Sequence, residues 1–295
     1  MKKNKNPKIG LALGSGGAKG LAHIGVLKVL KRNNIPIDYI AGSSVGAMLG
    51  AFYAANEDIE ELEKVILSFN RKKSLSLLDF TMQGGFLKGN KTEKFIAEIL
   101  NGAKFDTLKI PFAAVATDIN TAETVVFQDG SLVKAIRASI AVPAFFQPSQ
   151  YKNRLLSDGG LSNPVPVDVV KDMGADITIA VNLDSVYIEK PFKHAPALSM
   201  VPMHSVNILR HTLAKQSVKT ADVVILPPDM YHVGILGWKY IFDNEKAKQI
   251  IKLGEEATEH ALPSIKHTIH RYRYRRTKIG KFFSFFDTFR LKGFN

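Results

Sequence analysis

Short apolar runs alternate with stretches of helical periodicity along most of the chain. Apolar, β-branched runs predict strands, and apolar residues three and four positions apart predict helices. The first elements follow in the order strand, helix, strand, helix, which predicts parallel strands joined by right-handed crossovers. Strands are expected at 9–13, 35–41, 111–117, 124–127, 176–183 and 222–226, and helices at 21–30, 45–55, 58–69, 92–100, 166–173, 199–220 and 245–261.

This pattern predicts an α/β fold. No internal repeat or low-complexity linker is present before about residue 265, so we expect one domain over residues 1–265 and a tail over residues 266–295. No run approaches the 18 apolar residues of a membrane-spanning helix. The apolar run behind the basic N-terminus, residues 9–13, is too short for a signal peptide. We expect a cytoplasmic protein, with peripheral association at the inner face of the membrane.

The composition excludes several classes of protein. Hydrophobic residues make up 45% of the 295-residue chain and charged residues 23%, which argues against a disordered protein. The absence of cysteine excludes a disulfide scaffold, a thiolate metal site and a cysteine nucleophile. The formal net charge of +13 indicates an anionic partner: nucleic acid, a membrane surface or an anionic substrate. Much of this charge lies in residues 261–295, which contain nine lysine and arginine residues and one acid, Asp287.

A Gly-x-Ser-x-Gly pentad, residues 42–46, lies between a predicted strand and a predicted helix. This context is typical of a nucleophile elbow, a turn so sharp that Gly42 and Gly46 crowd each other on either side of the serine. Ser44 would lie at the helix N-terminus, where the helix dipole favours developing negative charge. An ordinary turn rich in glycine and serine is the alternative.

A second glycine-rich segment follows the first predicted strand, from Gly14 to Gly20. A phosphate-binding P-loop would need serine or threonine after Lys19, and a dinucleotide loop starting at Gly14 would need glycine at position 19, so both patterns fail. Gly16 and Gly17 leave bare amide groups that could bind the oxyanion of an acyl-transfer intermediate. A tight strand-to-helix turn remains the alternative.

The third segment is Asp158-Gly159-Gly160, which taken alone is usually a turn. It gains weight because a serine nucleophile needs a base, and no histidine has an evident acidic partner in the sequence. His23 lies inside the first predicted helix, where a packed or capping role is expected. The sequence offers no evident cluster of metal ligands, and we expect neither a metal nor a cofactor.

These segments, in their order along the chain, resemble those of the patatin-like phospholipase family and of its small bacterial members in particular. The resemblance spans about residues 8–230 and rests on residues 11–27, 41–46, 138–143 and 158–166. It implies a three-layer α/β fold in which helices flank a mainly parallel central sheet. It also implies a serine acyl hydrolase that cleaves fatty-acyl esters of lipids through a Ser–Asp dyad, without histidine.

The resemblance assigns roles to individual residues. Ser44 would be the nucleophile and Asp158 the base. Lys19 stands where the family has Arg or Lys, and it would fix the loop or meet a phosphate. One departure from the family's glycine pattern is Ser15, which replaces its first glycine. The oxyanion hole would comprise the amides of Gly16, Gly17, Ala18 and Val45, and the supporting residues would be Lys19, Gly20, Gly42, Gly46, Gly159 and Gly160.

Two other functions use the same residues or the same fold. An acyltransferase would use the same dyad and pass the acyl group from Ser44 to an alcohol instead of water. A catalytically silent protein would keep the fold and bind membranes or nucleic acid through its tail. The intact Ser44, Asp158 and glycine loop argue against a silent protein.

The tail combines basic and aromatic residues. A basic segment, residues 270–281, precedes an aromatic one, residues 282–289. At helical spacing the apolar residues form one stripe, which suits an interfacial helix on anionic lipid, so residues 271–295 are predicted to contact an anionic membrane surface. The stripe could instead pack on the domain or on a second subunit; binding of RNA or single-stranded DNA is less favoured. The stripe comprises Ile279, Phe282, Phe283, Phe286 and Phe289.

Overall fold

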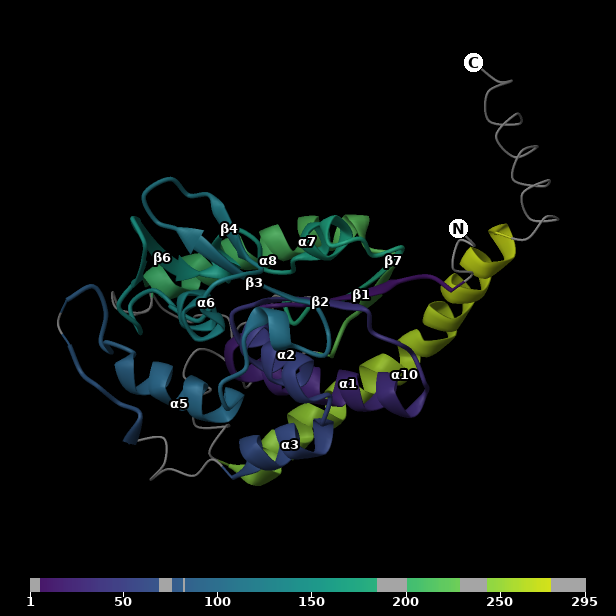
Figure 1. Ribbon diagram of the computed structural model, residues 1–295, viewed down its shortest axis with the longest axis horizontal. Helices are drawn as coiled ribbons and strands as arrows, with labels where there is room; N and C mark the ends of the chain where they lie inside the picture. The colour runs from purple at the N-terminus through teal and green to yellow at the C-terminus, as the bar shows by residue number, and fades with distance from the viewer. Residues whose placement is uncertain (1–5, 69–75, 82, 185–200, 229–242, 277–295) are drawn as a thin grey trace, which may run out of the picture.

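The strands form one sheet at the centre of the molecule (Figure 1). The computed structural model describes residues 6–68, 76–81, 83–184, 201–228 and 243–276. Within these ranges the sheet has eight strands in the order β5-β6-β3-β2-β1-β7-β8, and β4 also pairs with β3. The strands are β1 (Ile9–Leu13), β2 (Tyr39–Ser43), β3 (Phe112–Asp118), β4 (Thr124–Phe127), β5 (Ser149–Tyr151), β6 (Arg154–Asp158), β7 (Ile177–Val181) and β8 (Val223–Ile225).

Parallel pairing dominates the centre of this sheet. β1 pairs in parallel with β2 and β7, and β2–β3 and β7–β8 are also parallel. The antiparallel pairs are β3–β4, β3–β6 and β5–β6, at one side of the sheet. The carboxyl ends of β1, β2, β7 and β8 therefore lie along one edge, the usual place for a site in such folds.

Helices cover both faces of the sheet. Figure 1 shows α1, α2, α3 and α10 on one face and α7 and α8 on the other, which confirms the three-layer α/β fold. The longer helices are α1 (Ala22–Arg32), α2 (Val45–Asn56), α3 (Ile59–Leu67), α5 (Asn90–Leu100), α6 (Leu132–Ser139), α7 (Val167–Asp172), α8 (Val201–Ser217) and α10 (Asn244–Arg275). Short 3-10 turns are η1 (Gly17–Leu21), η2 (Phe105–Thr107), η3 (Gly159–Leu161) and η4 (Val218–Thr220).

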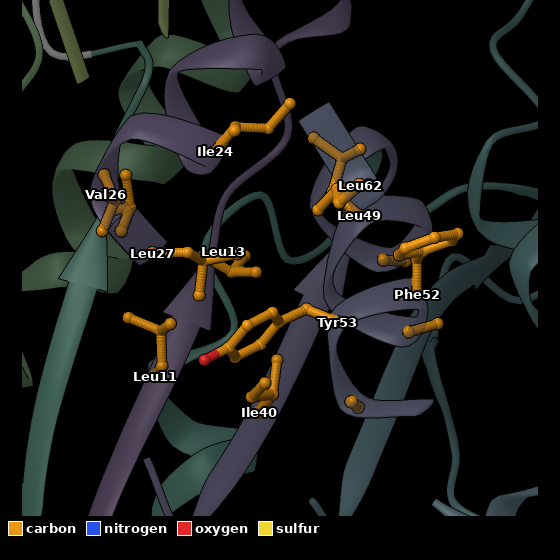
Figure 2. Close-up of a cluster of buried hydrophobic side chains, with 14 of the residues drawn as sticks. Leu11, Leu13, Ile24, Val26, Leu27, Ile40, Leu49, Phe52, Tyr53 and Leu62 are labelled. Carbon is orange, nitrogen blue, oxygen red and sulfur yellow. The ribbon is translucent and has the colours of Figure 1, made fainter. Parts of the chain in front are cut away.

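The alternation of side chains along β1 divides the core into a large and a small part. Leu11 and Leu13 are fully buried in the large cluster, with residues of α1 and α2 (Figure 2). Residues of α10 belong to the same cluster. Ala12 points the other way, into a smaller cluster with Val170 of α7 and Ala214 of α8. Burial of each large aliphatic side chain contributes about 1.5–3 kcal/mol. Both faces are covered, as a parallel sheet requires.

Most predicted elements are present, with some differences. The second strand begins at Tyr39 rather than at residue 35, because Asp38 accepts the amide of Ile9 at 2.8 Å and turns the chain into the sheet. Helix α6 and strands β5 and β6 were not predicted. Ser131 caps α6 by accepting the amide of Lys134, while β5 and β6 are short and partly exposed, so their apolar pattern is weak.

Helix α10 extends fourteen residues beyond the predicted end at residue 261, to Arg275. It continues past Pro263 because Leu262, Ile265 and Ile269 remain buried against the large cluster. The helix thus crosses position 265, where the sequence placed the end of the domain. Residues 277–295, with the predicted aromatic stripe, lie outside the described residues. Among the residues that the structure describes, no helix is both long and apolar enough to span a bilayer.

Candidate active site

Ser44 occupies a strained turn between β2 and α2. Its backbone dihedrals are φ 55° and ψ −125°, a conformation that non-glycine residues rarely adopt. A Cβ on Gly42 would lie 2.4 Å from the carbonyl oxygen of Gly46, and a Cβ on Gly46 would lie 2.2 Å from that of Leu13. These approaches require glycine at both positions. The segment therefore has the predicted geometry of a nucleophile elbow.

The pairing of β3 brings Asp158 to this elbow. Ser43, the last residue of β2, lies opposite Val115 of β3. Asp158, the last residue of β6, lies opposite the next residue, Ala116. Strand β4 pairs with the same part of β3 along its other edge. Because β4 overlaps both β2 and β6 along β3, these two strands lie on the same edge of β3. β2 runs parallel to β3 and β6 antiparallel, so their carboxyl ends meet, which places Asp158 beside Ser44.

The two side chains form a short, buried hydrogen bond. Ser44 Oγ donates to Asp158 Oδ2 at 2.6 Å, and the amide of Gly160 donates to Asp158 Oδ1 at 2.8 Å. Ser44 is 5% exposed and Asp158 6%. Burial raises the pKa of Asp158 to about 6, although the hydrogen bonds from Ser44 and Gly160 and the charge of Arg210 act in the opposite direction. This pKa suits a group that must accept a proton near neutral pH.

The glycine loop supplies unused backbone donors beside the elbow. No hydrogen bond between described residues uses the amide of Gly16, Gly17, Ala18 or Val45. A Cβ on Gly20 would lie 2.3 Å from Val45, so the loop packs directly against the first residue of α2. The end of the glycine loop therefore contacts the start of α2, and the amides of the predicted oxyanion residues have no partner among the described residues.

The side chain of Lys19 belongs to a buried ion-pair cluster. Its Nζ donates to the carbonyl of Leu183 at 2.8 Å and to Asp184 Oδ1 at 2.7 Å. Arg210 of α8 donates to the same carboxylate. Of the two roles implied for Lys19, the contacts match fixation of the loop. The sequence analysis missed Asp184 and Arg210, although the position of Asp184 after a parallel strand was a signal.

Two other polar side chains form hydrogen bonds with the backbone of the site. Ser139 accepts the amide of Ser44, and His23 Nε2 lies 2.8 Å from the carbonyl of Gly14. Since a carbonyl only accepts, the Nε2–H of His23 is the donor. The packed role expected for His23 matches its complete burial. The Ala138–Pro143 segment was singled out, but a role for Ser139 was not.

The Asp158-Gly159-Gly160 motif packs tightly against β3 and the glycine loop. A Cβ on Gly159 would lie 2.2 Å from the carbonyl of Val115, and one on Gly160 would lie 3.0 Å from Ser15 Oγ. In the part of the chain that the structure describes, no group of three histidine or acidic side chains is placed to hold a metal ion. The geometry thus offers a serine, a carboxylate and a set of amides, which together can perform acyl transfer.

Comparison with known proteins identifies relatives of this chain. A family model described as patatin-like phospholipase matches residues 11–171. An uncharacterized NTE family protein of Mycobacterium bovis is 41% identical over 182 residues, which cover 61% of this chain and 50% of that protein. The chain thus spans about half the length of that relative. The human patatin-like phospholipase domain-containing protein 6 is 32% identical over 183 residues, 60% of this chain and 13% of that protein.

The fold resembles a solved structure at low sequence identity. The crystal structure of VipD from Legionella pneumophila aligns with a TM-score of 0.54 and 12% identity. The alignment covers 88% of this chain and 67% of that chain. At this identity the likeness concerns the fold alone.

Proposed function

The chain belongs to the patatin-like phospholipase family, and from this premise we propose that it is a serine acyl hydrolase that cleaves fatty-acyl esters of lipids. One observation carries the proposal: the 2.6 Å hydrogen bond from Ser44 Oγ to Asp158 Oδ2, beside amides without a partner among the described residues. A buried serine in a strained turn, bonded to a carboxylate of raised pKa, is an arrangement suited to nucleophilic catalysis.

In the first half-reaction, Ser44 Oγ attacks the carbonyl carbon of the ester while its proton passes to Asp158 Oδ2. The tetrahedral intermediate carries its negative charge on the former carbonyl oxygen. The amides of Gly16, Gly17, Ala18 and Val45 would bind that oxygen. The C–O bond to the alcohol then breaks, and the alcohol leaves with the proton from Asp158. Ser44 is left as an acyl ester.

In the second half-reaction, water repeats the attack on the acyl-enzyme. Asp158 takes a proton from the water, the same amides bind the oxyanion, and the fatty acid leaves as the proton returns to Ser44. The carboxylate is a weak base for a hydroxyl, so most of the stabilisation must come from the amides. Loss of one such donor typically costs about 2.7–4 kcal/mol.

An acyltransferase differs only in the acceptor, because an alcohol replaces water in the second half-reaction. Product analysis with glycerol or a lysolipid as acceptor separates the two: a hydrolase releases fatty acid, whereas a transferase forms a new ester. A catalytically silent membrane-binding protein would show neither product. No observation on the described residues favours either alternative over hydrolysis.

We also propose an anionic membrane surface as the partner of residues 271–295. The last turn of α10 carries Arg273 and Arg275, Arg271 shortly precedes it, and the residues that follow are basic and aromatic. Near an anionic bilayer each basic residue contributes about 1 kcal/mol. Such a contact would hold the enzyme at the surface where its lipid substrate lies.

Labelling with a fluorescent fluorophosphonate tests the activated serine. Wild type is expected to label, and both Ser44→Ala and Asp158→Asn are expected to lose labelling. Ser43→Ala is the matched control, since Ser43 is buried next to Ser44 and its Oγ has no hydrogen-bond partner among the described residues. Folded wild type that does not label, in detergent or with lipid vesicles, would contradict the proposal, as would full labelling of Ser44→Ala.

A further inference from the structure

A single buried carboxylate joins two parts of the active site that are far apart in sequence. Asp184 follows β7 and is 5% exposed. Its Oδ1 accepts from Lys19 Nζ at 2.7 Å and from Arg210 Nη2 at 3.1 Å, and its Oδ2 accepts from Arg210 Nε at 2.6 Å. The two cations hold the pKa of Asp184 well below its usual range, although burial alone would raise it. The carboxylate is therefore charged and doubly paired.

One end of this cluster belongs to the glycine loop. Lys19 is in η1, directly after the proposed oxyanion amides, and its Nζ also donates to the carbonyl of Leu183. A Cβ on Gly16 would lie 2.8 Å from the Leu183 side chain, so the loop rests on the segment that follows β7. The amide of Gly14 donates to Val181 at 3.1 Å. The glycine loop thus packs on residues 181–184 and is hydrogen-bonded to them.

The other end of the cluster belongs to α8. Arg210 binds the carboxylate with two nitrogens, and the ring of the next residue, His211, donates from Nδ1 to the carbonyl of Asp184 at 2.5 Å. Helix α8 also packs against η3, the turn that begins after Asp158. Few residues of α8 are buried, so these polar contacts are a large share of what fixes the helix at the site.

The cluster also acts on the proposed base, in addition to the larger effects of burial and of the hydrogen bonds to Asp158. The charge of Arg210 lowers the pKa of Asp158, and the charge of Asp184 raises it. Among the described residues, Lys19 and His211 also contact Asp184 directly. The pair therefore acts on Asp158 in opposite directions, and removal of one charge shifts the balance in a direction that can be measured.

We propose that Asp184 is a positioning residue: its carboxylate joins Lys19 of the glycine loop to Arg210 of α8 and thereby holds the oxyanion amides in place. The inference rests on the proposed function. A buried ion pair is by itself weak evidence for stability. Here it lies between a glycine-rich loop and a helix of which few described residues are buried.

Asp184→Asn tests the role in positioning, with Asp176→Asn as the matched control. Asp176 precedes β7, at the end of the strand opposite to Asp184, and accepts the amide of Lys8 at 2.9 Å. For Asp184→Asn we expect kcat on a p-nitrophenyl acyl ester and the rate of fluorophosphonate labelling to fall by about 100-fold, with KM within about twofold, because misplacement by 1 Å is sufficient for such a loss. Asp176→Asn is expected to keep both rates.

Two further substitutions keep the test decisive if Asp184→Asn does not fold. Lys19→Met should lower kcat and Lys19→Arg should restore it, because arginine keeps the charge and the donors that bind Asp184. The acid limb of the pH–rate profile should move to higher pH in Arg210→Gln and to lower pH in Asp184→Asn. Residues that only stabilise the fold would not produce shifts of opposite sign.

The outcomes separate this inference from the proposed function. Active wild type that loses activity in Ser44→Ala, but keeps its kcat in Asp184→Asn or in Lys19→Met, overturns the inference alone. An equal loss of kcat in Asp176→Asn also overturns it, because the effect would then be one of general stability. Wild type that neither hydrolyses esters nor labels overturns the proposed function and the inference with it.

Discussion

The hydroxyl of Ser139 forms a hydrogen bond with the backbone amide of Ser44. The amide of Ser44 donates to Ser139 Oγ at 2.9 Å, and this hydroxyl donates to the carbonyl of Val115 at 2.5 Å. Ser139 is fully buried at the end of α6, and Val115 belongs to β3. One hydroxyl thus links the strained elbow to the strand that also pairs with β6, and it fixes the backbone from which the proposed nucleophile projects.

Ser139→Ala is expected to weaken both the fold and the elbow. The change leaves the Ser44 amide and the Val115 carbonyl without this partner, which should lower the free energy of unfolding by about 1–3 kcal/mol. Labelling of Ser44 should slow by between about 10- and 100-fold, because the nucleophile loses its fixed orientation. Denaturant unfolding and labelling rates measure the two effects.

The control for this change is Thr258→Val. Thr258 is also fully buried, and its hydroxyl donates to Gly254 at 2.7 Å inside α10, away from the elbow. It should cost stability without slowing labelling. Equal labelling rates in Ser139→Ala and wild type would contradict a role for Ser139 in orienting Ser44.

The pKa of Asp158 predicts an acid limb in the activity profile. Burial raises this pKa to about 6. As the base, Asp158 must be ionised, so kcat/KM should be constant above that pH and fall tenfold per pH unit below it. A pH series with a neutral ester substrate measures the limb. A limb near the ordinary aspartate pKa of about 4 would show that Asp158 is not the group that titrates.

The same burial predicts that Asp158→Asn is more stable than wild type at neutral pH. Because the folded pKa lies above the unfolded one, the wild type loses stability as the pH rises from about 4 to about 6 and carries the full cost above it. A shift of about two units corresponds to about 3 kcal/mol at most. Denaturant unfolding at pH 7 should show this gain, which should vanish near pH 4. An equal or lower stability at pH 7 would contradict the prediction.

The burial of His23 predicts that acid lowers the stability of the fold, which is opposite to the effect predicted for Asp158. Complete burial lowers the pKa of His23 to about 4, against the hydrogen bond to Gly14. The unfolded histidine binds its proton first, so the folded state loses stability as the pH falls from about 6.5 to about 4, by about 3 kcal/mol at most. In His23→Gln an amide donor replaces Nε2–H without titrating, and this loss should disappear.

Unfolding of His23→Gln at pH 7 and pH 5 measures the effect. His260→Gln is the control, since His260 is an exposed residue of α10. It should keep the acid sensitivity of wild type. The same dependence on pH in His23→Gln and wild type would show that His23 does not contribute.

The end of α10 defines where to truncate the chain in a test of membrane binding. Tyr272 packs against the large core cluster, and Arg276 caps the helix and lies 3.8 Å from Asp176. Removal of residues 277–295 should therefore leave the melting temperature unchanged and weaken sedimentation with phosphatidylserine vesicles. Removal from residue 271 should also destabilise the domain. Unchanged binding after the shorter deletion would contradict the proposed role of the tail.

The sequence by itself determined the features that depend on residues close together along the chain. Gly42 and Gly46 around Ser44 predicted the elbow, because only glycine tolerates the close approaches of that turn. The glycine loop after the first strand predicted exposed amides for the same reason. The α/β order of apolar runs predicted the layered fold, since strands buried on both faces and amphipathic helices have different periods. Strands such as β6, short and partly exposed, carry too little of that pattern.

The tertiary structure alone decided which distant residues meet. Asp158 lies 114 positions from Ser44, and β3 brings them together because two strands end at neighbouring positions along one of its edges. Asp184 lies 165 positions from Lys19. A buried charge requires a partner, but neither its identity nor its position follows from local sequence. Sheet register and helix packing, which depend on the whole core, select that partner.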